Sequence, residues 1–316
     1  MPTLTTQHEV RGPWSLATSR EFWEGFAPAA LPGAIDHGLH TVFRVDADWS
    51  RAAASVRQDG AQATVEVEGD GDLEAATAQV LRFLALDVDA TGWPAVGKRD
   101  PVVGAAQAAL PGLRPCGFHS PYEAAVWAVL SQRVRVVQAA ALRARITLAL
   151  GDGGALPAPA VLAGADLDLP GRKPEYLRAV ARAALDGVLD GESLRLLDPH
   201  QAIERVQQVK GIGPFAAELI VVRGANAPDA LPTPRAAAGR RGRAPLRSGL
   251  GPRGGGGGMA PLPHLGGGAP AGAPRGAHAR DRRLIRRDVS GRARPRGVRA
   301  RRPAGAASPT AAGSRG

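Results

Sequence analysis

Cysteine is almost absent from this chain of 316 residues, since Cys116 is the only one. A single cysteine excludes a disulfide framework within the chain and a zinc or iron–sulfur site built on several cysteines. No run of about 18 apolar residues suggests a membrane span, and no charged-then-apolar signal segment opens the sequence. We therefore expect a cytoplasmic protein with no membrane partner.

Residues 233–316 contain no Phe, Trp, Tyr or Lys. Arg, Gly, Ala and Pro make up 65 of these 84 residues. So few apolar side chains cannot offset the entropy that the chain loses on folding. This part of the sequence is therefore expected to be a disordered, basic Arg/Gly-rich tail.

The formal net charge of +11 belongs to that tail, which has 19 arginines and only two aspartates. Residues 1–232 are net acidic, with 21 basic and 27 acidic residues. A basic RNA-binding or ribosomal-type protein fits that acidic part poorly. The codons of Arg, Gly, Ala and Pro can all begin with two G or C bases, so we expect a GC-rich gene that is out of frame from about Thr233. The open alternative is a native tail that binds nucleic-acid phosphates by charge.

Residues 1–90 predict a small α+β domain. Helices are expected over residues 19–26 and 73–86, and residues 87–100 are interpreted as a connector because of Gly92 and Pro94. Alternating apolar residues predict strands at 41–45, 54–57 and 63–67, the last two joined at Asp59-Gly60.

From residue 101 the pattern is helical. Ser120 followed by Pro121 and Glu123 is typical of a capped helix start. Further helices are expected over residues 136–150 and 175–189. The fold class is therefore mainly α: an all-helical domain over residues 101–232 preceded by the small α+β domain.

A Gly-rich turn ends this helical pattern. Gly211 and Gly213 stand two apart and are followed by Pro214, which suits the first turn of a helix. Asp198 and Pro199 predict a capped start for the helix before the turn. A helix N-terminus with free backbone amides fits a phosphate group. The pattern therefore favours a helix-hairpin-helix clamp on a DNA backbone over an ordinary loop in a helical core.

Three blocks of residues 101–232 resemble the helix-hairpin-helix DNA glycosylases, specifically the 3-methyladenine DNA glycosylase II (AlkA) type. They are Ala109–Arg114 with Ser120–Gln132, then Arg172–Leu177, then Gly211–Ala217 through Leu231-Pro232. The resemblance implies a monomeric, nucleoid-associated bacterial enzyme that flips alkylated purines such as 3-methyladenine out of double-stranded DNA and hydrolyses the N-glycosidic bond. Such an enzyme needs no cofactor.

The same resemblance implies roles for individual residues. The backbone contacts to DNA are assigned to Lys210, Gly211, Ile212 and Gly213, the base pocket to Phe215 and Leu219, and the loop that enters the minor groove to Gln132 and Arg133. The backbone carbonyls of Gln207, Val209 and Ile212 match those that hold a structural Na⁺ or K⁺ ion. Core packing for Phe215 and a solvated side chain for Arg133 stay open, because family members often have an apolar wedge at the latter position. Tyr122 and Trp127 are expected in the core.

The catalytic carboxylate is where the sequence departs from this family. Family members have an Asp just after the Leu-Pro pair, but here Thr233 follows Pro232 and the next carboxylate is Asp281. Asp229 is close by, but precedes the pair. Bifunctional relatives have a Schiff-base lysine at the position of Phe215, so strand cleavage is not expected. We expect an impaired monofunctional glycosylase; the alternative is a non-enzymatic DNA-binding protein.

Overall fold

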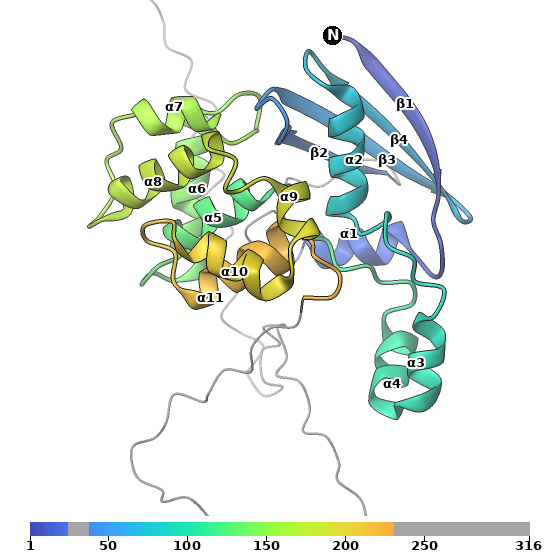
Figure 1. Cartoon of the computed structure of the whole chain (residues 1–316). Helices are drawn as coiled ribbons and strands as arrows, with labels where there is room; N and C mark the ends of the chain where they lie inside the picture. The colour runs from blue at the N-terminus through green and yellow to red at the C-terminus, as the bar shows by residue number, and fades with distance from the viewer. Residues whose placement is uncertain (25–37, 231–316) are drawn as a thin grey trace, which may run out of the picture. The chain divides into compact units, whose positions relative to one another are not determined.

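The computed structural model describes residues 1–24 and 38–230, all within one compact unit of the chain (Figure 1). The expected tail over 233–316, the Leu-Pro pair and the end of the helix expected over 19–26 lie outside the described residues. No helix in the described ranges is long and apolar enough to cross a membrane.

An antiparallel four-stranded sheet forms the first part of the chain. Its strands are β1 (Thr3–Glu9), β2 (Leu39–Arg44), β3 (Arg51–Asp59) and β4 (Gln62–Gly69), in the spatial order β1-β4-β3-β2. β3 and β4 form a hairpin in which Asp59 pairs with Gln62, and Gly60 takes a φ of +57°. The three expected strands are confirmed, whereas the turn lies one residue later than expected, at Gly60-Ala61, and β1 was not predicted.

Two helices complete this part, and α2 lies across one face of the sheet (Figure 1). They are α1 (Leu16–Glu24) and α2 (Leu73–Phe83). The Asp72 carboxylate accepts the Ala75 amide and so caps α2. Phe83 and Val65 are completely buried in the core between helix and sheet. The expected helix over 73–86 is confirmed, with its end three residues earlier.

The prediction of a connector over residues 87–100 is wrong. Helix α3 (Trp93–Arg99) lies there, and α4 (Pro101–Ala109) follows it. Pro94 stands in the first turn of α3, where a proline starts a helix instead of breaking it. No residue of either helix is buried, and Trp93 and Val102 are about half exposed. An apolar face of this helix pair is therefore exposed.

The rest of the described chain is helical, as expected. Its elements are α5 (Pro121–Leu130), α6 (Val136–Leu150), α7 (Pro159–Gly164), α8 (Lys173–Leu185), α9 (Gly191–Leu196), α10 (Pro199–Gln207), α11 (Pro214–Leu219) and the π-helical turn η1 (Ile220–Gly224). Every residue of α5 is buried, so α5 is the centre of this helical core. α8 begins two residues before the expected start and ends four residues before the expected end.

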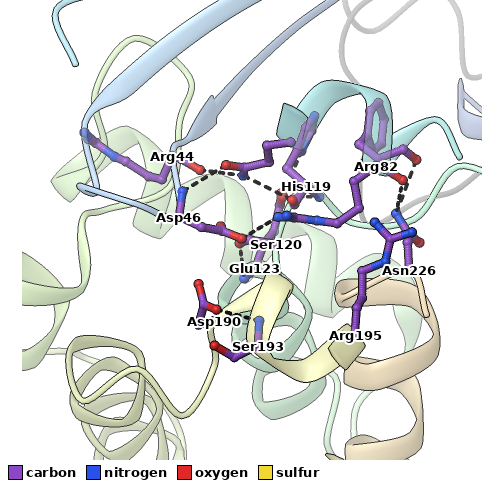
Figure 2. Close-up of polar contacts among 12 residues, drawn as sticks. Arg44, Asp46, Arg82, His119, Ser120, Glu123, Asp190, Ser193, Arg195 and Asn226 are labelled. Atoms are coloured by element: carbon purple, nitrogen blue, oxygen red, sulfur yellow. Dashed lines mark hydrogen bonds and ion pairs between the residues drawn. The ribbon is translucent and has the colours of Figure 1, made fainter. Parts of the chain in front are cut away.

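Buried polar groups connect the end of β2, α2 and the start of α5 (Figure 2), where the Gln79 amide donates to the carbonyls of Arg44 and His119. The His119 ring contacts the Thr41 hydroxyl at 2.7 Å and the Glu123 carboxylate at 2.8 Å, and Glu123 also pairs with Arg143. Burial alone would raise the pKa of Glu123, but the charges of His119 and Arg143 lower it to about 2. Glu123 reaches the His119 amide, while Ser120 caps α5 through the Glu123 amide. The helix start expected at Ser120 is confirmed.

Candidate nucleic-acid interface

The Gly-rich turn joins two helices, as predicted. The Asp198 carboxylate accepts the amides of His200 and Gln201 at the start of α10. Pro214 stands in the first turn of α11, and the chain stays helical through η1 to Gly224. Gly213 is the N-cap of α11, and no side chain caps that end by a hydrogen bond. The turn therefore presents the positive end of a helix at an exposed glycine.

The two glycines of the turn have different reasons to lack a side chain. Gly211 has a φ of +92°, and a Cβ there would lie 2.4 Å from Cγ of Tyr176. The fold itself therefore requires Gly211. Gly213 has an extended backbone (φ −89°, ψ 175°), and a Cβ on it would meet no atom within 4 Å. No described residue would clash with a side chain at 213, so this position leaves space for a close approach from outside.

The charge of Lys210 is shared with α8. Its Nζ lies 2.5 Å from Oε1 of Glu175, and Glu175 also accepts the Arg172 guanidinium at 2.8 Å. These hydrogen bonds, first from Arg172 and then from Lys210, lower the pKa of Glu175 to about 2. The Lys210 side chain is still 60% exposed. An approaching phosphate would therefore compete with Glu175 for this ammonium group.

The loop between α5 and α6 contacts the turn directly. Nε2 of Gln132 donates to the carbonyl of Gly211 at 2.8 Å. The next residue, Arg133, is exposed and has a left-handed φ of +57°, which is uncommon for a residue with a side chain. This exposure fits both interpretations of Arg133, a residue that enters the minor groove and a solvated side chain. The structure thus brings Gln132 to the predicted hairpin, while the minor-groove role of the loop stays a prediction.

Lys173 is a buried residue at this site to which the sequence assigned no role. It is only 6% exposed, and its Nζ donates to the carbonyls of Val129, Leu130 and Gln132 at 2.9, 3.0 and 2.8 Å. Burial lowers the pKa of this ammonium group. No local pattern could indicate these bonds, because the acceptors lie more than 40 residues away in sequence. The one signal in the sequence is that Lys173 stands within the second block of the resemblance.

Phe215 is 58% exposed on the first turn of α11, which argues against plain core packing. Leu219 is half-buried and packs on the helical core. Tyr122 and Trp127 are buried, as expected, and the Tyr122 hydroxyl donates to the Pro157 carbonyl. The base-pocket roles of Phe215 and Leu219 stay predictions.

The predicted cation ligands are backbone carbonyls, whose oxygen atoms suit Na⁺ and K⁺. The Val209 carbonyl already accepts the Ile212 amide at 3.0 Å, but a carbonyl oxygen has a second lone pair. The carbonyls of Gln207 and Ile212 complete the predicted set. The donor set fits such an ion, and the site stays a prediction.

Within the described ranges, no group of three or more His, Cys, Asp or Glu side chains could hold a metal ion. Asp229 is exposed in the turn after η1. A cavity of about 780 Å³ is lined by residues of α3 and α4 and by the neighbours of Asp229, among them Trp93, Pro228 and Ala230. No hairpin residue lines this cavity. The role of Asp229 as a substitute for the catalytic carboxylate stays a prediction.

Searches with family models gave no match to this chain. Curated proteins do match it. It is 31% identical over 192 residues to DNA-3-methyladenine glycosylase 2 of Escherichia coli strain K12, covering 57% of this chain and 67% of that protein. It is 28% identical over 161 residues to a DNA-3-methyladenine glycosylase of Bacillus subtilis strain 168, covering 46% and 53%. The chain thus spans between half and two thirds of these relatives.

A solved structure has the same fold. The 3-methyladenine DNA-glycosylase from Archaeoglobus fulgidus superposes with a TM-score of 0.55 at 19% identity, over 70% of this chain and 79% of that one. The superposition shows that the two chains share a fold. The chain therefore belongs to the DNA-3-methyladenine glycosylase family.

Proposed function

We propose that this chain is a monofunctional base-excision glycosylase, built to hydrolyse the N-glycosidic bond of alkylated purines such as 3-methyladenine in double-stranded DNA. Its identity to an E. coli protein named DNA-3-methyladenine glycosylase 2 is the observation that carries this proposal. The geometry of the hairpin and of the neighbouring loop supports it. A monomer, a cytoplasmic location and a hairpin cation stay predictions.

Backbone amides at the hairpin provide the DNA contact in this proposal. The exposed Gly213 leaves room for a phosphate oxygen at the positive end of α11. Lys210 adds a charge once a phosphate displaces Glu175. Contacts of this kind position the protein on any duplex and carry no base information.

Excision requires the damaged nucleotide to leave the stack, at a cost of roughly a few kcal/mol. In this proposal Arg133, which is exposed beside Gln132, fills the vacated space. Phe215 offers an exposed ring near the hairpin, and a cationic alkylated base is attracted to a ring face. Because position 215 is not a lysine, a Schiff base cannot form there, which supports a monofunctional reaction.

The chemical step lacks its expected carboxylate. In family members an Asp after the Leu-Pro pair stabilises the positive charge that develops on the sugar, and here no carboxylate follows Pro232 until Asp281. Loss of one such preorganised group typically costs about two to three orders of magnitude in rate. The same absence favours the second candidate, a DNA-binding protein without catalysis.

The test is release of methylated bases from alkylated duplex DNA by the chain as written and by a version with the reading frame restored after Pro232. We expect release by the restored version and at least about a hundredfold slower release by the chain as written. Equal release by both would show that another carboxylate, such as Asp229, does the work, and Asp229→Asn would then abolish it. No release by the restored version, together with intact duplex binding, would favour the non-enzymatic alternative.

A further inference from the structure

Lys173 closes the C-terminal end of α5 from another helix. A lysine ammonium group has three donors, and all three are used on the carbonyls of Val129, Leu130 and Gln132. The first two carbonyls belong to the last turn of α5, where the helix dipole is negative, and the Val129 carbonyl also accepts the Gln132 amide at 3.3 Å. This arrangement accounts for a charged group that is 6% exposed.

The third bond reaches beyond the helix. It holds the carbonyl of Gln132, whose side chain donates to the Gly211 carbonyl in the hairpin. Arg133 follows directly with its left-handed backbone. The conformation that aims the loop 131–135 is thus fixed at its first residues, by Lys173 on one side and by the hairpin on the other.

The same turn of α8 also holds the hairpin. The Tyr176 ring lies against Gly211 so closely that no Cβ fits between them. Glu175, next to Tyr176, pairs with Lys210. Three residues within four positions of α8 therefore contact the loop 131–135 or the hairpin 208–213. The start of α8 thus contacts the hairpin through Glu175 and Tyr176 as well as the end of α5 through Lys173.

We propose that Lys173 is a positioning residue, which sets the loop 131–135 at a fixed distance from the hairpin so that the loop can enter the duplex where the hairpin grips the phosphates. This inference rests on the proposed function, because it assigns the loop to base displacement. Loss of Lys173 should leave phosphate binding nearly intact and should impair unstacking of the target base.

The experiment compares full-length variants. Lys173→Met keeps the length and apolar stem of the side chain but removes the charge and the three donors, whereas Lys173→Arg keeps the charge and should restore part of the effect. Lys98→Met is the matched control, since Lys98 is exposed on α3 and the charge change is the same. Gln132→Ala removes only the bond to Gly211 and decides the matter if Lys173→Met does not fold.

Three measurements are made on each variant. Hydrogen exchange reports on segments 131–135 and 208–213, anisotropy reports binding of a duplex, and 2-aminopurine fluorescence reports unstacking of a base in that duplex. For Lys173→Met we expect exchange in 131–135 to speed up about tenfold. We also expect duplex binding within about threefold of the unmodified chain and unstacking weakened about tenfold.

The outcomes separate this inference from the function on which it rests. Unchanged exchange in 131–135 and unchanged unstacking in folded Lys173→Met would overturn the positioning role. Equal losses of binding and unstacking would also overturn it, because they indicate a general structural role. If the unmodified chain binds DNA without unstacking any base, the proposed function fails. Even then, faster exchange in 131–135 of Lys173→Met would support the role of Lys173 in positioning this loop. Unchanged exchange would overturn that role.

Discussion

Replacing Gly213 with Asp should strengthen the fold and weaken DNA binding at the same time. The residue is the N-cap of α11, with φ −89° and ψ 175°, and a Cβ on it meets open space. Asp is among the preferred N-cap residues, and its negative charge suits the positive end of a helix. A substitution that opposes these two properties separates a contact with DNA from a requirement of the fold.

The magnitudes follow from what the side chain adds. A carboxylate cap in place of glycine should raise the free energy of unfolding by about 0.3–1 kcal/mol. On DNA, the new side chain occupies the space that a phosphate would need, and a hydrogen bond to a charged group contributes about 1.5–3 kcal/mol. The dissociation constant should therefore rise at least about tenfold.

Duplex binding is measured by anisotropy on the full-length chain at several salt concentrations, because residues 233–316 add 19 arginines and binding of phosphates by charge weakens with salt. The loss should be the same for every duplex sequence. Gly213→Ser adds the cap without the charge and separates crowding from repulsion. Gly164→Asp is the matched control, since a Cβ at Gly164 also meets open space and lies far from the turn in sequence.

A folded Gly213→Asp protein that binds duplexes within about twofold of the unmodified chain would refute the hairpin assignment. Gly211→Ala supplies the contrast. Its positive φ and the Tyr176 ring require it to destabilise the fold, so a loss of binding there would prove nothing about DNA contact.

Three further predictions concern the buried ionisable groups. Glu123→Gln should lower the free energy of unfolding by about 3 kcal/mol, because Arg143 and His119 lose their carboxylate. The pKa of Glu123 in the folded protein is lowered to about 2, so its stabilising contribution is present above pH 4.5 and is lost as the pH falls towards 2. Urea titrations at several pH values measure this loss. Burial outweighs the charge of the nearby Arg82 and raises the pKa of Asp46 to about 7. The contribution of Asp46 to the free energy of unfolding is therefore full below pH 3.8 and is lost as the pH rises through 7. Asp46→Asn should flatten the dependence of that free energy on pH over this range, and equal slopes for the variant and the unmodified chain would contradict this. Burial also raises the pKa of the Cys116 thiol to about 12, so a disulfide reagent at pH 8 should label it only after denaturation, and rapid labelling of the native protein would refute its burial.

Local chemistry made the hairpin readable from the sequence. Asp198, Ser120 and the Asp59-Gly60 turn act on backbone groups within a few residues, so their signals survive whatever surrounds them. The start of the second hairpin helix at Pro214 is equally local. The position of the hairpin is therefore encoded locally in the sequence.

The elements that were missed had weak or ambiguous signals. β1 is an edge strand with no buried residue, so its sequence has little apolar alternation to read. Pro94 lies in the first turn of α3, and because a proline suits both a connector and a helix start its signal is ambiguous. The bonds of Lys173 and of Gln132 join residues 41 to 79 positions apart, and no local pattern encodes such pairings.

The burial of Lys173 also means that the lysines of this chain should differ in their reactivity towards a chemical reagent. The sequence has only three lysines, and they occupy an exposed helix (Lys98), the hairpin (Lys210) and the interior (Lys173). Reductive methylation followed by mass spectrometry would therefore report on three separate places in one sample. Lys98 would modify first and set the scale, Lys210 would be shielded when a duplex is added, and Lys173 would modify only when the end of α5 comes apart from α8.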